Sequence, residues 1–105
     1  MPTAYVTAPR EAAEGIAEAL VERRLAACVN VVDCESVYRW EGAVVSDAEA
    51  ILIAKTTADA YDALASTVDE LHPYDVPCIE RFDERDVAEP FAAWRSESVD
   101  PDRES

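Results

Sequence analysis

The sequence predicts a single α+β domain over residues 1–105, a ferredoxin-like βαββαβ sandwich with an extra C-terminal helix. The length of 105 residues, half of them apolar, suits one domain with a modest core and is too short for two. Strand-like runs alternate with two longer runs of helical spacing, in the order β-α-β-β-α-β. The two middle strands follow each other across a short turn, as in a hairpin.

The chain begins with a strand and a helix. The run TAYVTA (3–8) favours a strand, which Pro9 closes. The run EAAEGIAEALVERRL (11–25) places apolar side chains at helical spacing opposite a glutamate-rich side. Arg23 and Arg24 are expected in its last turn, where cations complement the helix dipole. The apolar positions of this helix are Ala13, Ile16, Ala17 and Leu20.

The middle of the chain favours a long hairpin. The run ACVNVVDCESVYRW (27–40) has the composition of a strand, and AEAILIAKT (48–56) returns as another. Glu41 and Gly42 supply the turn between them. In the expected antiparallel sheet the strand order is 4-1-3-2, with the hairpin at one edge.

The second half of the chain predicts a helix, a strand and a short final helix. The run TTADAYDALASTVDELHP (56–73) favours a helix that Pro73 stops, and a strand follows over 78–83. The final helix covers 89–98, with Pro90 near its first turn. The expected apolar stripe of the longer helix is Tyr61, Leu64, Ala65, Val68 and Leu71, and the expected anchors of the final helix are Phe91 and Trp94.

Both faces of the predicted sheet carry apolar side chains, although two helices cover only one face. A bulge near Asp33 would switch the phase of the 27–40 strand, but it would not hide the run Ile51, Leu52, Ile53. Other copies of the chain are therefore expected to cover the second face. The open face and the hairpin edge are expected to carry Val32, Tyr38, Trp40 and Leu52.

The net charge disfavours nucleic acid as a partner. The chain has 23 Asp and Glu against nine basic residues, a formal charge of −14, and such a surface repels phosphate backbones. The acids are scattered, which indicates a solvated coat rather than a cation-binding cluster. This composition predicts a halophilic protein whose stability rises with added KCl. With neither a basic leader nor an apolar run of about 18 residues, we expect a cytoplasmic protein without membrane contact.

The sequence favours a non-catalytic protein. Asp47 and Glu49 form a carboxylate pair, but on so acidic a chain such a pair is expected at the surface. Gly15 and Gly42 are the only glycines, so a Gly-rich phosphate loop is absent, as is a nucleophile–His–acid set. An enzyme or an RNA binder on this fold would need an anion cradle or aromatics in basic strands, and the sequence has neither.

The three cysteines, Cys28, Cys34 and Cys78, are expected to be thiols, because their number is odd and none forms a C-x-x-C pair. Cys28 and Cys34 lie about 20 Å apart in one strand, at ~3.3 Å per residue, so they cannot share an ion. Cys78 is expected on the opposite edge of the sheet. Burial as a small apolar side chain is favoured over soft-metal binding, and any multi-cysteine site would form between subunits.

Five motifs in order resemble the CutA divalent-cation tolerance family: RLAACVNVV, SVYRWEG, ILIAKT, HPYDVP and FAAW. The resemblance runs from about Tyr5 to Trp94 and marks a single CutA-like domain. It implies a homotrimer, similar in build to the PII signalling proteins, with the long hairpin reaching between neighbours. It also implies a role in response or tolerance to divalent metal ions, with copper binding in some members. The alternative is a PII-like signalling module that binds a small ligand at its subunit clefts.

The resemblance also implies a place for a metal ion. Some bacterial members are thought to use a cysteine at the end of the first strand and one or two histidines before Pro-Tyr. These positions fall on Val6, Leu71 and His72, so His72 alone carries a ligand for copper or another divalent ion. Asp75, three residues further on, could join it. The alternative for His72 is capping of the helix C-terminus before Pro73.

Three aromatic residues, Tyr38, Trp40 and Tyr74, are expected to fill a subunit interface. The alternative is that they stack a base or line a cleft for a small molecule.

Overall fold

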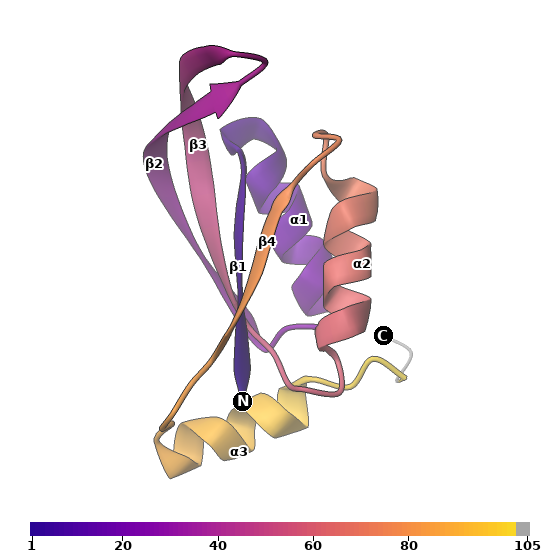
Figure 1. Ribbon diagram of the computed structural model, residues 1–105. Coiled ribbons are helices and arrows are strands. Elements are labelled where there is room, and N and C mark those ends of the chain that lie inside the picture. The colour runs from indigo at the N-terminus through magenta and orange to yellow at the C-terminus, as the bar shows by residue number, and fades with distance from the viewer. Residues whose placement is uncertain (103–105) are drawn as a thin grey trace.

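The computed structural model describes residues 1–102 and contains four strands and three helices in the predicted order (Figure 1). The elements are β1 (Pro2–Pro9), α1 (Arg10–Glu22), β2 (Cys28–Trp40), β3 (Ala43–Lys55), α2 (Tyr61–Leu71), β4 (Cys78–Asp83) and α3 (Glu89–Ser98). The strands form one antiparallel sheet in the order β2-β3-β1-β4, which confirms the predicted topology. No helix within the described residues is long and apolar enough to cross a membrane.

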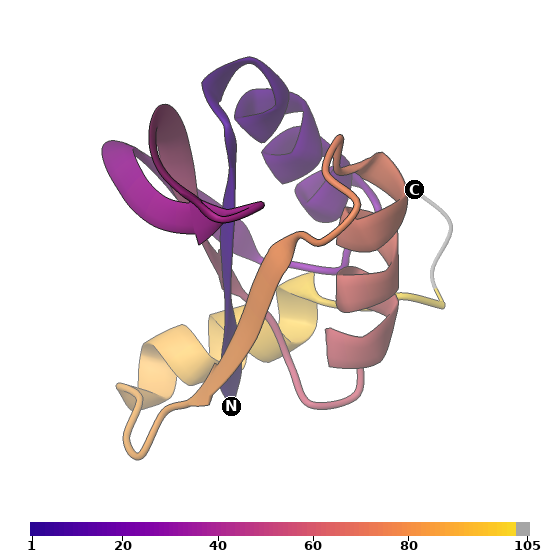
Figure 2. The same cartoon turned by 45° about the horizontal axis from the view of Figure 1, so that its top comes forward.

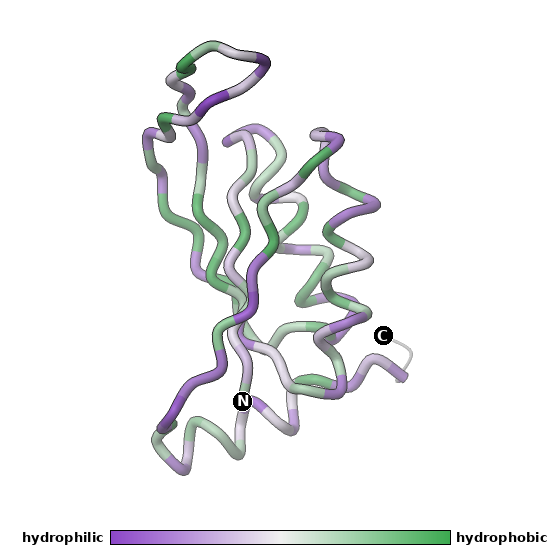
Figure 3. The backbone as a smooth tube through the Cα atoms, in the orientation of Figure 1, coloured by the Kyte–Doolittle hydropathy of each residue, from purple (hydrophilic) through white to green (hydrophobic). Residues whose placement is uncertain are grey.

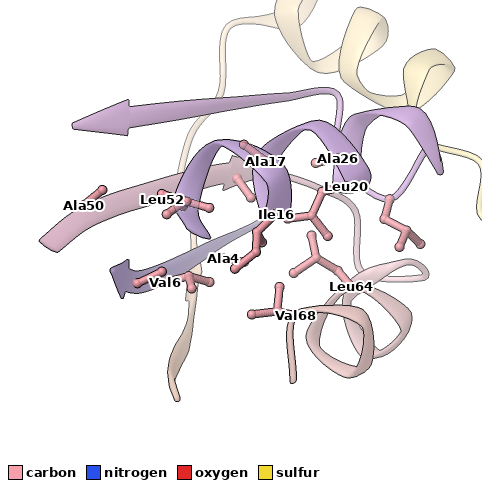
Figure 4. Close-up of a cluster of buried hydrophobic side chains, with 14 residues drawn as sticks. Ala4, Val6, Ile16, Ala17, Leu20, Ala26, Ala50, Leu52, Leu64 and Val68 are labelled. Atoms are coloured by element: carbon pink, nitrogen blue, oxygen red, sulfur yellow. The ribbon is translucent and has the colours of Figure 1, made fainter. Parts of the chain in front are cut away.

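The core lies between the sheet and the helices α1 and α2, which share one of its faces (Figure 4). Successive residues of a strand point to opposite faces, so every second residue of β1, and of the part of β3 that pairs with it, enters this core. Leu52 is one of them and is fully buried, opposite Val6 and Val31 in the register. The prediction that Leu52 lies on the open face is therefore wrong. The strand residues of this core are Ala4, Val6, Ala8, Ala50, Leu52 and Ala54.

The apolar stripes of both helices are largely confirmed, whereas their C-terminal ends differ from the prediction. The α1 helix ends at Glu22, and Arg24 takes a left-handed conformation with φ 57°, so neither predicted arginine lies in the last turn. The backbone N–H of Leu25 instead turns back to the carbonyl of Leu20 at 2.9 Å and leads the chain into β2. Leu71 is exposed at the end of α2, because the buried position there belongs to His72. The buried helix residues are Ala13, Ile16, Ala17, Leu20, Leu64, Thr67 and Val68.

The β2–β3 hairpin is longer than predicted and extends well beyond the rest of the sheet (Figure 1). Its register is unbroken from the pair Cys28–Lys55 to the pair Trp40–Ala43, so there is no bulge near Asp33. The turn residues Glu41 and Gly42 have φ values of 48° and 82°, the combination that a two-residue turn with the twist of a hairpin requires. β1 pairs only with residues 49–55 of β3, which leaves the distal half of the hairpin without a neighbouring strand.

Helix α3 is anchored by an arginine rather than by its aromatic residues. Arg95 is 1% exposed and donates hydrogen bonds to the carbonyl oxygens of Thr56, at 2.7 Å, and Pro2. Its guanidinium also pairs with Glu84 at 2.8 Å. The predicted anchors Phe91 and Trp94 are both exposed and stack on each other at 5.6 Å between ring centroids. The prediction for these two residues is wrong, because the helix turns Arg95 toward backbone carbonyls at the end of the sheet.

Candidate functional site

The face of the sheet opposite α1 and α2 is the open face. Hydrophobic residues recur along both β2 and β3 (Figure 3). The register places Val32, Ile51, Thr7 and Cys78 side by side in one row across this face. Ile51 is half-buried and Val32 is exposed, because no helix within residues 1–102 covers the row. This face is therefore the apolar surface that the sequence predicts, although Ile51 and not Leu52 belongs to it.

A cavity of about 580 Å³ lies on the open face, between the distal hairpin and the loop that joins α2 to β4. In Figure 2 the hairpin tip leans over the sheet toward this loop. The cavity brings together the three predicted interface aromatics, Tyr38, Trp40 and Tyr74. Its lining residues are Thr7, Ser36, Tyr38, Trp40, Glu49, Pro73, Tyr74, Asp75, Val76 and Cys78.

His72 fixes the wall of this cavity that the loop forms. Its ring is buried, and Nε2 lies 2.8 Å from the carbonyl oxygen of Thr7 in β1. Nδ1 accepts a hydrogen bond from the backbone N–H of Tyr74 at 3.1 Å, so Nε2 carries the proton that it donates to Thr7. The ring therefore ties the loop to β1 instead of capping the carbonyls of α2. Metal binding at His72 would require the ring to give up one of these two hydrogen bonds.

Glu49 is the buried acid of the site, which corrects its predicted place at the surface. Glu49 is only 4% exposed, and its Oε2 accepts a hydrogen bond from the hydroxyl of Tyr74 at 3.0 Å. Arg10 approaches Glu49 but donates to its backbone oxygen, while its charge faces Asp33 and Glu35. Within residues 1–102, no cation lies within ion-pair distance of the Glu49 carboxylate.

The two tyrosines of the site are held as neutral hydrogen-bond donors. Burial, together with the hydrogen bond to Glu49, raises the pKa of Tyr74 to about 12. The hydrogen bond to Asp47 raises the pKa of Tyr38, and Asp47 lies diagonally across the hairpin on the same face. Both phenols therefore remain protonated at neutral pH.

The pH dependence of Tyr74 provides a first test of this geometry. Because its pKa is raised in the folded state, the stabilisation is complete below pH 10 and is lost as the pH rises through about 12. Absorbance titration of the phenolate should show a late transition that is missing in Tyr74→Phe. In Glu49→Gln, which keeps an acceptor but removes the charge, the transition should move to lower pH. An unchanged titration curve in Glu49→Gln would contradict the coupling.

The three cysteines are free, as predicted, and they do not converge. Cys28 and Cys34 lie in β2 at one edge of the sheet, and Cys78 lies in β4 at the other. Cys78 lines the cavity, and burial raises the pKa of its thiol, which favours the neutral form. In the part of the chain that the structure describes, no group of three or more His, Cys, Asp or Glu side chains is placed to hold a metal ion.

The sequence already indicated which face of the sheet Glu49 occupies. It lies in phase with Ile51 and Ile53, so its side chain had to share their face of β3. Its burial could not be predicted, because Tyr74 covers it from a loop 25 residues further along the chain.

Comparison with known proteins identifies the family. Residues 3–98 match the family described as CutA1 divalent ion tolerance protein. The chain is 48% identical over 102 residues to the divalent-cation tolerance protein CutA of Thermus thermophilus, covering 95% of this chain and 92% of that protein. It is 41% identical over 96 residues to the CutA of Pyrococcus horikoshii, covering 90% and 94% of the two chains.

Solved structures agree with this assignment. The CutA1 structure from Thermus thermophilus superposes with a TM-score of 0.90 at 43% identity, covering 95% of this chain and 100% of that one. A PII-like protein CutA from Nostoc sp. PCC 7120 superposes with a TM-score of 0.92 at 30% identity, covering 95% and 98%. The fold, the hairpin and the order of the motifs thus lead to one conclusion, that this chain belongs to the CutA divalent-cation tolerance family.

Proposed function

We propose that this protein is a non-catalytic homotrimer that acts in response or tolerance to divalent metal ions and binds copper. The observation that carries the proposal is the match of nearly the whole chain to proteins named for divalent-cation tolerance. The acidic composition further supports a function in a salt-rich cytoplasm, where screening weakens the repulsion among surface carboxylates.

The open face supports the assembly part of the proposal. Val32, Trp40 and Phe82 expose about half of their surface there, next to the half-buried Ile51 and Ile53. A contiguous apolar surface of this kind on a small protein is typical of a subunit interface. Two further copies would cover it and would place the distal hairpin of one subunit against its neighbour.

The metal part of the proposal rests on His72 as the single imidazole. Imidazole is a good ligand for copper and zinc, and Asp75 follows three residues later in the same loop. A complete coordination sphere would then need donors from a neighbouring subunit, because the described residues of one chain bring no third ligand close.

Titration of the assembled protein with copper and zinc in molar KCl would test this site. Loss of the imidazole in His72→Ala should remove the specific site, whereas Glu14→Gln, at an exposed position of α1, should keep it. High salt suppresses general attraction of cations to the acidic surface. Equal stoichiometry and affinity in wild type and His72→Ala would reject a specific site at His72. Metal binding would then reflect general attraction of cations to the acidic surface.

The cavity supports a second candidate function, a signalling module that binds a small ligand at its subunit clefts. Its volume of about 580 Å³ lies within the range of ligand pockets, roughly 300–1,000 Å³. A thermal-shift screen of charged and neutral metabolites should find stabilising compounds, and Trp40→Leu should weaken their effect. A screen in which no compound raises the melting temperature would count against this candidate.

A further inference from the structure

We infer that the cavity on the open face selects a small organic cation, because its walls join three aromatic rings to a buried carboxylate. The inference rests on the second candidate function and names the chemistry of its ligand. It depends on the residues that line the cavity, and His72, the proposed metal ligand, is not among them.

The ionisable side chains that line the cavity include carboxylates and no cation. The lining contains two carboxylates, Glu49 and Asp75, and no lysine, arginine or histidine. The Glu49 carboxylate is almost removed from water, and the hydroxyl of Tyr74 gives it one hydrogen bond but no positive charge. Burial of a carboxylate is costly unless a cation compensates it, so a cationic ligand would supply what the described residues lack.

The aromatic walls favour a cation that carries its charge on carbon-substituted nitrogen. Trp40 and Tyr38 extend from the hairpin and Tyr74 from the loop, so the rings flank the cavity from two sides. The face of an aromatic ring attracts ammonium groups, and tryptophan does so best. Because both tyrosine hydroxyls donate to carboxylates, their oxygen lone pairs remain available to accept hydrogen bonds from a ligand.

Other ligand classes fit the cavity less well. A bare divalent ion needs several hard oxygen or nitrogen donors at close range, and the described residues bring no such group together here. Cys78 offers a neutral thiol rather than a thiolate. A nucleotide or another anion would be repelled by Glu49 and Asp75.

Calorimetric titration with choline and with its neutral isostere, 3,3-dimethylbutan-1-ol, separates charge from shape. Both probes are added to the assembled protein at a constant total ionic strength set with KCl. Choline should bind at least about tenfold more tightly than the neutral alcohol, because only choline pairs with Glu49 and the ring faces. Equal affinity for the two probes would overturn the inference.

Variants locate the site. Glu49→Gln should weaken choline binding about tenfold while leaving the alcohol unaffected, and Glu14→Gln, which removes the same charge from exposed α1, should change neither. If circular dichroism shows that Glu49→Gln is unfolded, Asp75→Asn replaces it, because it removes the other lining carboxylate at an exposed position, and weaker choline binding is again expected. Choline affinity that survives in the folded variants would overturn the inference.

A third probe, ATP, distinguishes the inference from the function on which it rests. Stabilisation by ATP or by the neutral alcohol without binding of choline would reject the organic cation and keep a ligand cavity. Failure of all three probes, together with a negative metabolite screen, would reject the ligand-binding candidate as well. The copper and zinc titration of His72→Ala tests the proposed metal site and does not test the ligand of the cavity.

Discussion

Replacement of Arg95 by alanine is expected to lower the free energy of unfolding by about 3 kcal/mol, because it removes a buried guanidinium from two backbone carbonyls and from the partly exposed carboxylate of Glu84. The guanidinium donates hydrogen bonds to the carbonyls of Thr56 and Pro2 and also pairs with the carboxylate of Glu84. Its removal frees two backbone acceptors and detaches α3 from the end of the sheet. Urea denaturation monitored by circular dichroism measures the loss.

Arg85→Ala is the matched control for this substitution, since Arg85 is exposed in the loop before α3 and should change stability by less than about 0.5 kcal/mol. Arg95→Lys should recover only part of the loss, because an ammonium cannot reach three acceptors with the fork of a guanidinium. If Arg95→Ala unfolded at the same urea concentration as Arg85→Ala, this role of Arg95 would be refuted.

The same network predicts an acid-sensitive step. Burial raises the pKa of Glu84, but hydrogen bonds from Arg95 and Thr3 outweigh it, so the pKa lies below its ordinary value. A carboxyl with a lowered pKa stabilises the folded state above its unfolded pKa, and this stabilisation is lost as the pH falls through the folded pKa. The decline of stability in acid should therefore be shallower in Arg95→Ala than in wild type.

In molar KCl the wild-type protein is expected to sediment as a trimer, and Trp40→Asp is expected to sediment as a monomer or to unfold. Trp40 is half exposed at the end of the hairpin, where a neighbouring subunit would cover it. A tryptophan at the centre of an interface typically contributes about 2 kcal/mol or more, and a buried aspartate adds a desolvation cost. Analytical ultracentrifugation at several protein concentrations measures the change.

Val21→Asp provides the control for assembly, because Val21 is similarly exposed but lies on α1, on the helical side of the molecule. This variant should remain a trimer. A wild-type protein that is monomeric and well behaved in high salt would reject the assembly, and so would a trimer that persists in Trp40→Asp.

Prediction from sequence succeeded where a pattern is local and failed where a partner is distant. The helical spacing of Ala13, Ile16 and Leu20 needs no knowledge of the rest of the chain, and the structure buries all three. Phe91 and Trp94 have the same apolar character, yet α3 turns Arg95 inward because the carbonyls of Pro2 and Thr56 lie there. The sequence around Arg95 does not indicate that its hydrogen-bond acceptor is the carbonyl of Pro2, 93 residues away.

The candidate site divides in the same way. Tyr38, Trp40 and Tyr74 could be recognised from the sequence, as could His72 at the end of its helix. The cavity that joins the aromatics could not, because it forms only where the distal hairpin meets the α2–β4 loop. The use of both nitrogens of His72 in hydrogen bonds within the chain likewise depends on the position of Thr7 in β1.

The sequence by itself determined the order of the strands and helices, the topology of the sheet and the presence of an apolar face without a helix to cover it. Residue spacing along the chain encodes these features, because strands and helices expose their side chains with fixed periods. Only the tertiary structure decided that Leu52 is core, that Glu49 is a buried acid and that Arg95 anchors the final helix. Burial and pairing arise between segments far apart in the chain, and no local period records which of them will meet.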